Sequence, residues 1–241
     1  MAFPFSIVIP TYNEAAGIVK LLEALDATFR AHGLDGEVIV VDDNSPDGTG
    51  QIVDELSARL PVRCLHRAGK LGLSSAVIDG WRAARSESVA LGAMDADFSH
   101  DVNALPQMVA ALESGKYGLA VGSRYVTGGG IANWPVRRIV TSRVACWLAR
   151  PLTRVKDVTS GYLLVRRDAL EGVNLDPIGF KIGLEVIAKA HYGKAIEVPY
   201  VFTDRTAGVS KLNEREIFNY LKQLSRLYAA ALTSRTAREH H

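Results

Sequence analysis

The stretch Val89-Ala90-Leu91-Gly92-Ala93-Met94-Asp95-Ala96-Asp97 joins an apolar run of strand length to two carboxylates. Side chains two residues apart on an extended segment point to the same side, so Asp95 and Asp97 would repel each other. A divalent cation carrying a diphosphate would relieve that repulsion, because hard oxygen ligands suit Mg2+ or Mn2+. Pairs of this kind also occur on solvated turns, so the motif alone leaves a plain surface loop open.

On both sides of this run, the first half of the chain alternates apolar runs of strand length with segments whose apolar residues have helical spacing. The pattern predicts strands at 6–9, 38–41, 62–65, 89–94 and 119–122, and helices around 18–29, 52–60, 77–81 and 105–112. Such alternation predicts an α/β fold with a mainly parallel, Rossmann-like sheet flanked by helices. In these sheets, ligands bind beyond the carboxyl ends of the strands.

The second half is less regular. It predicts helices at 135–152 and 180–191, a loop from Asp157 to Tyr162 that leads into a strand through Leu164 and Val165, and a strand at 195–202. It also predicts an amphipathic C-terminal helix with Ile217, Leu221, Leu224 and Tyr228 on one stripe. We expect a catalytic domain over 1–215 and a C-terminal amphipathic helical extension over 216–241. No apolar run approaches the roughly 20 residues that cross a bilayer, and because 6–9 is typical of a first strand we expect no signal peptide.

Bulk composition restricts the class of protein. The chain has 241 residues, of which 48% are hydrophobic and 22% charged, so it can build a substantial core. The net charge of +2 favours no polyanionic partner, and we expect no nucleic-acid ligand. Cys64 and Cys146 lie far apart without metal-ligand spacing, which is typical of reduced core residues in a cytosolic protein.

Polar side chains follow the predicted strands where ligands are expected. Asp43, after the second strand, can accept hydrogen bonds from a base or ribose, and Tyr12 can pack against a flat base. Glu14 can serve the same site or act as an acid at a helix N-terminus. The chain has neither the Gly-x-Gly-x-x-Gly dinucleotide fingerprint after strand one nor a P-loop.

A basic segment without acidic residues lies between Glu113 and Asp157. Arg138 and Ser142 are four residues apart on a predicted helix, and with Arg124 they can bind a phosphate. A solvated arginine face is the alternative. Trp134 and Trp147 among these arginines indicate an interfacial helix on an anionic membrane, although Trp147 can equally pack in the core.

His100 follows the carboxylate pair and has two possible roles. It can hydrogen-bond beside the metal, or it can cap the following helix, and we favour the cap.

Taken in order, the motifs resemble the polyprenyl/dolichyl-phosphate mannosyltransferases, which are inverting glycosyltransferases of family 2 with a GT-A fold. The resemblance covers nearly the whole chain to about residue 225. Its blocks are Pro10-Thr11-Tyr12-Asn13-Glu14, Val41-Asp42-Asp43-Asn44-Ser45-Pro46-Asp47-Gly48-Thr49, Lys70-Leu71-Gly72-Leu73, Asp95-Ala96-Asp97-Phe98-Ser99-His100, Gly122-Ser123-Arg124-Tyr125, Arg137-Arg138, Ser142-Arg143, Asp157-Val158-Thr159-Ser160-Gly161, Gly179-Phe180-Lys181, Glu185, Asp204-Arg205 and Gly208-Val209-Ser210-Lys211-Leu212.

The resemblance implies transfer of mannose from GDP-mannose to a polyprenyl (dolichyl) monophosphate, giving β-D-mannosyl phosphopolyprenol. It implies a metal, Mg2+ or Mn2+, on Asp95 and Asp97, and acceptor-phosphate contacts from Arg124, Arg138 and Ser142. Arg205 and Lys211 would close over the donor, and Asp95, Asp97, Arg124 and Arg205 would be the catalytic set. The nucleotide-binding residues implied are Pro10, Tyr12, Glu14, Val41, Asp43, Ser45, Lys70, Asp95 and Lys211.

The chain departs from the family pattern in three places. Ser99 stands where Gln is frequent, which puts a third protein metal ligand in doubt, and Ser74 stands where Gly is common. Many members carry C-terminal transmembrane helices, which this sequence lacks. We therefore expect a peripheral protein on the cytoplasmic face of the membrane, lying on the membrane surface or using a membrane-anchoring partner.

A lipid-phosphate acceptor explains why no general base stands out. Such a phosphate is already anionic near pH 7, with a second pKa of about 6, so the protein must mainly offset repulsion between two anions. Three alternatives remain at this level: another donor such as UDP-glucose with the same acceptor, a nucleotide-binding regulatory subunit, and a sugar-1-phosphate nucleotidyltransferase. The last would want a glycine-rich basic loop after strand one, where Tyr12-Asn13-Glu14 stands instead.

Overall fold

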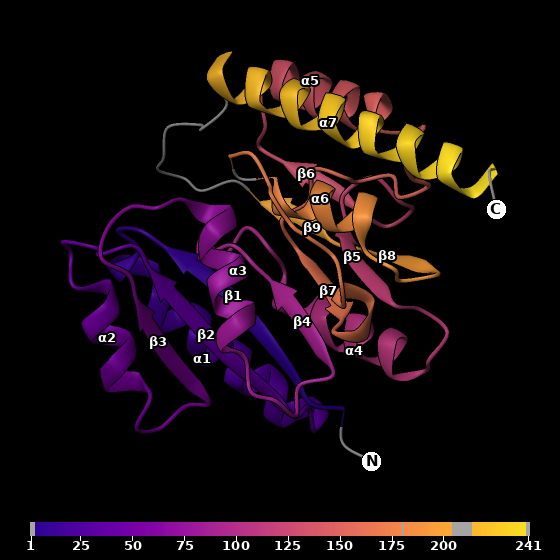
Figure 1. The fold of residues 1–241 in the computed structure, drawn as a ribbon. Coiled ribbons are helices and arrows are strands. Elements are labelled where there is room, and N and C mark those ends of the chain that lie inside the picture. Colours follow the sequence, from indigo (N-terminus) through magenta and orange to yellow (C-terminus); the bar gives the residue numbers. More distant parts are fainter. Residues whose placement is uncertain (1–2, 180, 204–213, 240–241) are drawn as a thin grey trace.

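The computed structural model describes residues 3–179, 181–203 and 214–239. A seven-stranded sheet is covered by helices on both faces, and a small second sheet lies beside it (Figure 1). In chain order the elements are β1 Phe5–Thr11, α1 Ala15–His32, β2 Gly36–Asp42, α2 Thr49–Leu56, β3 Val62–His66, α3 Leu73–Ala83, β4 Ala90–Ala93, η1 Val102–Ala104, α4 Leu105–Glu113, β5 Leu119–Ser123, β6 Gly130–Ala132, α5 Val136–Leu148, β7 Leu163–Arg166, η2 Asp168–Leu170, α6 Ile182–Lys189, β8 Ala195–Pro199, β9 Val201–Thr203 and α7 Glu214–Glu239.

The sheet order is β3-β2-β1-β4-β7-β5-β8. Strands β1 to β4 pair in parallel, as the alternation predicts, and β5 pairs in parallel with β8. Strand β7 runs antiparallel to both of its neighbours, β4 and β5. Its first residue, Leu163, therefore lies opposite Ala93 and Val121, near the carboxyl ends of those two strands. The loop that leads into β7 thus reaches the edge of the sheet where ligands are expected.

Two apolar layers sandwich the sheet because successive strand residues face opposite sides. Ile7 and Ile9 pack with α1, α2 and α4 on one face, while Val8 packs with α3 and α6 on the other. Trp81 fastens α3 to the sheet, since its indole N–H donates to the carbonyl of Gly92 at 2.8 Å. Burial on both faces explains why these strands read as continuous apolar runs rather than as alternating ones.

The structure corrects three predicted boundaries. Helix α2 ends at Leu56, and α5 spans Val136–Leu148 instead of 135–152. The strand predicted at 195–202 is two strands, β8 and β9, with Tyr200 between them. Tyr200 N–H donates to Ser123 in the large sheet, and its carbonyl accepts from Gly130 in the small one. The chain therefore changes sheets there, and β6, which the periodicity missed, supplies the partner of β9.

The C-terminal helix α7 lies along α5 (Figure 1). The hydroxyls of Tyr220 and Tyr228 donate to carbonyls of α5, at 2.5 and 2.6 Å. Leu224 and Leu227 belong to the apolar layer that also contains α3 and α6. No helix within the described ranges combines the length and apolar character needed to cross a bilayer. The division into 1–215 and 216–241 stays a prediction.

The close approach of α3 to the sheet depends on Gly80. A Cβ at Gly80 would lie 2.5 Å from Val8 Cγ1 and 3.0 Å from Val41 Cγ2, so Gly80→Ala overpacks the core and should cost about 1–3 kcal/mol. Gly17 is a helical glycine in α1 with nothing within 4 Å of its Cβ position. Gly17→Ala should raise stability by up to about 1 kcal/mol. Urea unfolding measures both; equal effects of the two substitutions would contradict this packing.

Candidate active site

The loops after β1 and β2 are joined side by side by Ser45. Its hydroxyl accepts the Asn13 N–H at 3.0 Å and donates to Asp42, whose carboxylate also accepts from Thr11. Asn13 and Asn44 adopt positive φ of 61° and 58°, a conformation that Asn tolerates better than most residues. The sequence prediction that polar loops gather at this edge is confirmed, and Asp42 stabilises the turn rather than facing a ligand.

Asp43 is a buried carboxylate at the same edge. Its Oδ2 accepts the Gly72 N–H at 3.0 Å, and its Oδ1 lies 3.1 Å from Nη1 of Arg67. These contacts tie the loop before α3 to the end of β2. In that loop, the Lys70 ammonium lies 3.9 Å from the centre of the Tyr12 ring, so the two residues predicted to meet a nucleotide are neighbours.

Asp95 and Asp97 form a turn after β4. Both are half-buried, whereas Ala96 between them is buried, which is the alternation expected for two carboxylates that share a side. The Asp97 carboxylate accepts the backbone N–H of Ser99 at 3.1 Å and its hydroxyl as well. Ser99 is itself buried, so it holds Asp97 in place.

His100 holds the main chain of Asp95 in place through a hydrogen bond. Its Nδ1 accepts the Asp95 N–H at 3.1 Å, which leaves the proton on Nε2, 3.7 Å from the Asp95 carboxylate. The ring is buried and stacks on Tyr162 at 5.0 Å. Burial lowers the pKa of His100 against the opposing charges of Asp95 and Asp97, so the imidazole is neutral near pH 7. The predicted cap of the next helix is therefore wrong; Asp101 caps η1 instead.

Arg124 at the end of β5 forms a buried ion pair with Asp157 from the loop before β7. Its Nε and Nη2 donate to the two carboxylate oxygens at 2.7 and 2.6 Å, and Nη2 also donates to Thr159 at 2.7 Å. Burial alone would lower the pKa of Arg124, but the hydrogen bonds and charge of Asp157 raise it above its ordinary value. The guanidinium is a permanent, neutralised cation in the floor of the site.

The predicted contact of Arg124 with an acceptor phosphate stays a prediction; its side chain is 5% exposed and its charge is paired with Asp157. Arg138 lies above it, with its guanidinium 3.8 Å from the centre of the Trp134 ring that Arg124 also approaches at 5.2 Å. Ser142 lies 3.0 Å from the Thr159 hydroxyl. The three predicted residues are thus brought together, with Arg138 and Ser142 nearer the surface.

Two further charged residues escaped the sequence analysis as site candidates. Asp157 was named only as the end of the basic segment and within a motif, although its place as the first acidic residue after that segment was a usable signal. Lys181 stands at the start of α6, and burial followed by the charge of Arg124 lowers its pKa to about 8, against the charges of Glu216 and Asp95. Arg124 and Asp95, whose charges act on this pKa, belong to the two halves of the site, so the Lys181 ammonium lies close to both.

The remaining predicted residues are placed as follows. Pro10 is the one partly exposed residue of β1, next to the end of the strand, and Glu14 precedes α1, at the helix N-terminus that its alternative role requires. Val41 packs in the core, so only its main chain is left to meet a nucleotide. Arg205 and Lys211 lie outside the described residues.

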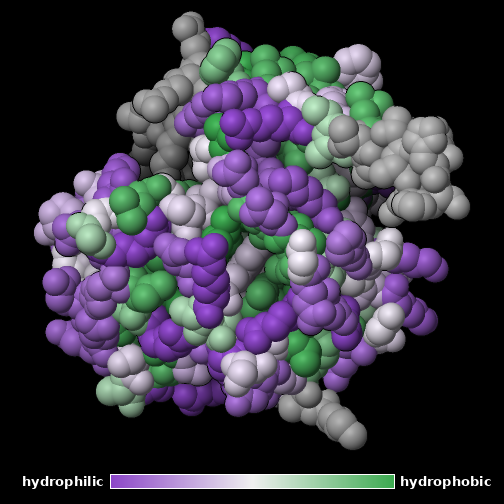
Figure 2. Space-filling model, viewed as in Figure 1, coloured by the Kyte–Doolittle hydropathy of each residue, from purple (hydrophilic) through white to green (hydrophobic). Residues whose placement is uncertain are grey.

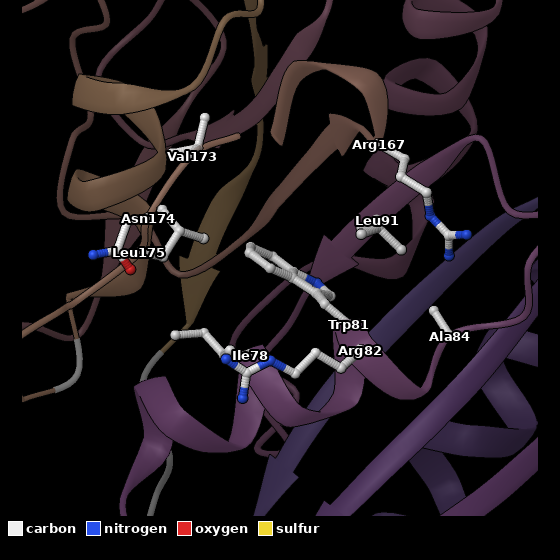
Figure 3. Close-up of a pocket in the computed structure, with 9 residues that line it drawn as sticks. All are labelled: Ile78, Trp81, Arg82, Ala84, Leu91, Arg167, Val173, Asn174 and Leu175. Carbon is white, nitrogen blue, oxygen red and sulfur yellow. The ribbon is translucent and has the colours of Figure 1, made fainter. Parts of the chain in front are cut away.

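A cavity of about 380 Å3 lies elsewhere, between α3 and the segment after β7 (Figure 3). The indole of Trp81 faces it, and its lining includes none of the predicted substrate or metal residues. It is lined by Ile78, Trp81, Arg82, Ala84, Leu91, Arg167, Val173, Asn174 and Leu175. The site at the strand ends is instead an open edge built from loops.

Residues 6–173 match the model of the family described as "Glycosyl transferase family 2". The chain belongs to glycosyl transferase family 2. The match runs from β1 through the loop after β7, and so includes both carboxylates and the Arg124–Asp157 pair.

Curated members of the family resemble the chain over most of its length. A dolichol-phosphate mannosyltransferase of Pyrococcus furiosus is 42% identical across 92% of the chain. The chain spans 63% of the length of that relative. A polyprenol monophosphomannose synthase of Mycolicibacterium smegmatis is 40% identical across 88% of the chain and 82% of its own length.

Among solved structures, a family-type fold is shared with a mannosyltransferase of Pyrobaculum calidifontis in complex with GDP-Man and Mn2+. The TM-score is 0.64 at 18% identity, over 97% of this chain and 65% of that one. This likeness establishes the shared arrangement of sheet and helices.

Breaking the buried ion pair should be costly. Asp157→Asn leaves the Arg124 guanidinium without its counter-charge, and we expect a loss of about 3–5 kcal/mol in the free energy of unfolding. The exposed pair of Arg166 and Asp168 provides the control, because Asp168→Asn should cost less than about 1 kcal/mol. Chemical denaturation measures the free energy of unfolding of both variants. An equal loss in Asp157→Asn and Asp168→Asn would contradict the buried ion pair.

Proposed function

We propose that this chain is a metal-dependent glycosyltransferase that moves mannose from GDP-mannose to a polyprenyl (dolichyl) monophosphate, giving β-D-mannosyl phosphopolyprenol. The observation that carries the proposal is that a pair of carboxylates and a cluster of arginines meet at the carboxyl ends of the strands. Buried His100 lies near both groups, because the charges of the half-buried Asp95 and Asp97 and of the Arg124–Asp157 pair all act on its pKa. Relatives at about 40% identity named for this reaction support the choice of donor and acceptor.

The donor nucleotide would lie over the ends of β1 and β2. Tyr12 is 37% exposed and held against Lys70, so its ring offers a face to the base while the ammonium can meet phosphate. Asp43 and Ser45 are engaged within the protein, and their remaining acceptor capacity faces the same edge. Pro10, Glu14, the main chain of Val41 and, by family resemblance, Lys211 and Arg205 complete the proposed donor site.

Asp95 and Asp97 are suited to hold Mg2+ or Mn2+. Their donors are hard carboxylate oxygens on one turn, with each residue fixed by a neighbour, Asp95 by His100 and Asp97 by Ser99. Gly161 leaves room beside Asp95, since a Cβ there would lie 3.4 Å from Oδ1. When bound, the cation neutralises charge on the leaving diphosphate.

The acceptor phosphate would meet Arg138 and Ser142. Arg138 stacks on Trp134, which pre-orients the planar guanidinium for a phosphate. Ser142 is held by Thr159, which in turn donates to Asp157, so the hydroxyl is positioned by the same buried pair. Arg124 fixes this framework from below, and Lys181 adds positive charge. Because the phosphate is already ionised, orientation and charge compensation suffice for attack at C1 with inversion.

Helices α5 and α7 would carry the membrane contact on the cytoplasmic face. Trp147 is 70% exposed, so the core-packing alternative is wrong, and Val136, Val140 and Val144 of α5 are exposed on the same side. Phe218 and Leu221 of α7 are also exposed, and Figure 2 shows hydrophobic side chains at the top of the view, where α5 and α7 lie in Figure 1. Arg137 and Arg143 flank the apolar residues, a pattern that favours anionic lipid.

The transfer reaction is tested with radiolabelled GDP-mannose, polyprenyl phosphate and Mn2+, followed by extraction into organic solvent. We expect label in the organic phase as a β-linked product. Asp97→Asn should lower turnover at least about 100-fold, since a metal supplies several kcal/mol of charge stabilisation. Asp176→Asn, a substitution at a largely exposed carboxylate, should leave turnover unchanged.

Three outcomes of this assay would overturn the proposal. They are label that remains in the aqueous phase, an α-linked product, and faster transfer from UDP-glucose than from GDP-mannose.

Membrane contact is tested by co-sedimentation with anionic phospholipid vesicles. Trp147→Glu should weaken vesicle binding at least about tenfold, because it removes a large apolar side chain from the contact. Val89→Glu makes the same charge change at an exposed apolar residue before β4, on the opposite edge of the sheet, and should bind like the unmodified protein. Equal binding by both variants would exclude α5 as the membrane face.

A further inference from the structure

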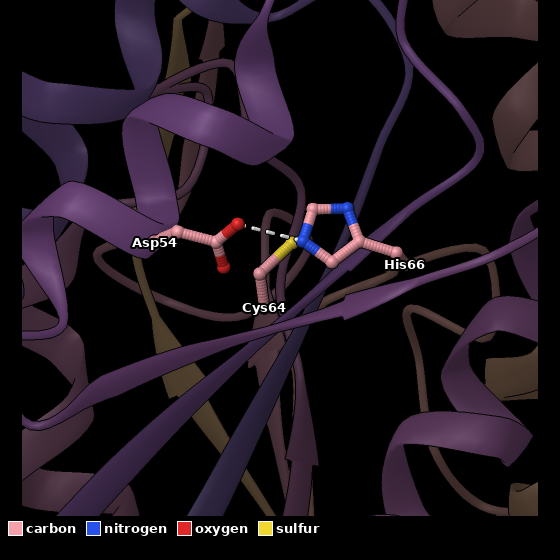
Figure 4. A group of neighbouring side chains, drawn as sticks. All are labelled: Asp54, Cys64 and His66. Atoms are coloured by element: carbon pink, nitrogen blue, oxygen red, sulfur yellow. Dashed lines mark hydrogen bonds and ion pairs between the residues drawn. The ribbon is translucent and has the colours of Figure 1, made fainter.

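A second cluster of metal-type ligands lies on the other side of the molecule, at the edge strand β3. Cys64 and His66 are two residues apart on that strand, so their side chains point to the same side. Asp54 comes from the last turn of α2, which packs across β3. Figure 4 shows the Cys64 sulfur, the His66 ring and the Asp54 carboxylate turned toward one another.

The three ligand atoms are close enough for one ion. They all lie within 4.8 Å of one another, and the His66 Nε2 to Asp54 Oδ2 separation is 2.9 Å. Ligand atoms around a tetrahedral Zn2+ lie about 3.3–3.8 Å apart, given its usual bond lengths. Small rotations of the half-exposed Asp54 and His66 side chains therefore bring the set to metal geometry.

The outer surroundings of His66 also suit a metal ligand. A Cβ at Gly50 would lie 2.9 Å from His66 Nδ1 and 3.2 Å from Asp42 Oδ2, and Asp42 is the residue paired with His66 on the neighbouring strand, so a carboxylate residue lies beside His66. Metal-binding histidines commonly have such a carboxylate partner, which fixes the tautomer. A side chain at position 50 would push this ring aside, so glycine there lets α2 lie close to His66.

We propose that Asp54, Cys64 and His66 form a site for a borderline-soft divalent ion, Zn2+ above all, with a fourth position open to water. Thiolate and imidazole prefer Zn2+ over Mg2+ or Mn2+, so the site differs in chemistry from the oxygen-only pair of Asp95 and Asp97. Its effect would be to cross-link α2 to β3. Asp42, which bonds to Thr11 and Ser45, connects this cross-link to the loops of the donor site.

Metal binding at this cluster would displace one proton, that of the Cys64 thiol, to solvent. Burial, followed by the charges of Asp54 and Asp42, raises the pKa of Cys64 to about 12, so the free thiol is protonated at neutral pH. The same negative charges that disfavour a bare thiolate favour a bound cation. The Zn2+–thiolate bond forms as the S–H bond is lost, and no oxidant or reductant takes part.

Titration of the full-length protein with Co2+, a spectroscopic substitute for Zn2+, tests the site. We expect a near-ultraviolet thiolate-to-cobalt charge-transfer band that reaches its plateau at one ion per chain and disappears when Zn2+ is added. Oxygen ligands such as Asp95 and Asp97, and the terminal His240 and His241, give no thiolate band. At a Zn2+ concentration 100 times Kd, the unfolding equilibrium should shift about 100-fold toward the folded state.

Single substitutions separate this site from its alternatives. Cys64→Ser should abolish the band, and His66→Gln and Asp54→Asn should each weaken Zn2+ binding at least about tenfold. Cys146→Ser removes the other thiol and should leave the band unchanged. Melting temperatures without metal establish that each variant is folded. A missing band in the unmodified protein, a band that survives Cys64→Ser, or unchanged affinity in His66→Gln would overturn the proposal, leaving a plain surface pair of Asp54 and His66.

Discussion

The buried pair of Arg124 and Asp157 is the interaction on which the site depends. It exists because β7 enters the sheet antiparallel between β4 and β5, so that the loop before it arrives where both neighbours end. That loop delivers Asp157 to Arg124, Thr159 to Ser142, and Gly161 to the side of Asp95. A parallel strand in the same place would begin at the opposite edge and leave Arg124 as an uncompensated buried charge, which is a large penalty in a protein interior.

Much of this architecture could be predicted from sequence because strands buried on both faces give continuous apolar runs, and the polar residues that follow them mark one edge. Thus 89–94 predicts both a strand and the place of Asp95 and Asp97. The direction of β7 leaves no such mark in Leu163–Arg166, so the partner of Arg124 could not be predicted. His100 was misassigned for the same reason, since its burial depends on Tyr162, Tyr200 and Phe202 from distant elements.

The two proposed metal sites offer different ligand types because they lie at different places on their strands. At the carboxyl end of β4, paired carboxylates on a partly exposed turn favour a hard cation beside a diphosphate. At β3, alternate residues place sulfur and nitrogen together, and α2 adds one oxygen. The Cys64-x-His66 spacing alone carried no metal signal, because the third ligand, Asp54, lies on a helix and meets them only in the folded chain. Asp42 lies between the two regions, bonded toward the donor loops and adjacent to His66.

The central claim is that the donor nucleotide and a divalent cation bind together at Asp95 and Asp97. Calorimetric titration of GDP-mannose, with Mn2+ and then with a chelator, measures it directly. Coupling between two ligands is reciprocal, so Mn2+ should tighten GDP-mannose binding, and GDP-mannose should tighten Mn2+ binding by the same factor, about 10- to 100-fold. Equal affinity for GDP-mannose with Mn2+ and with chelator would contradict the account.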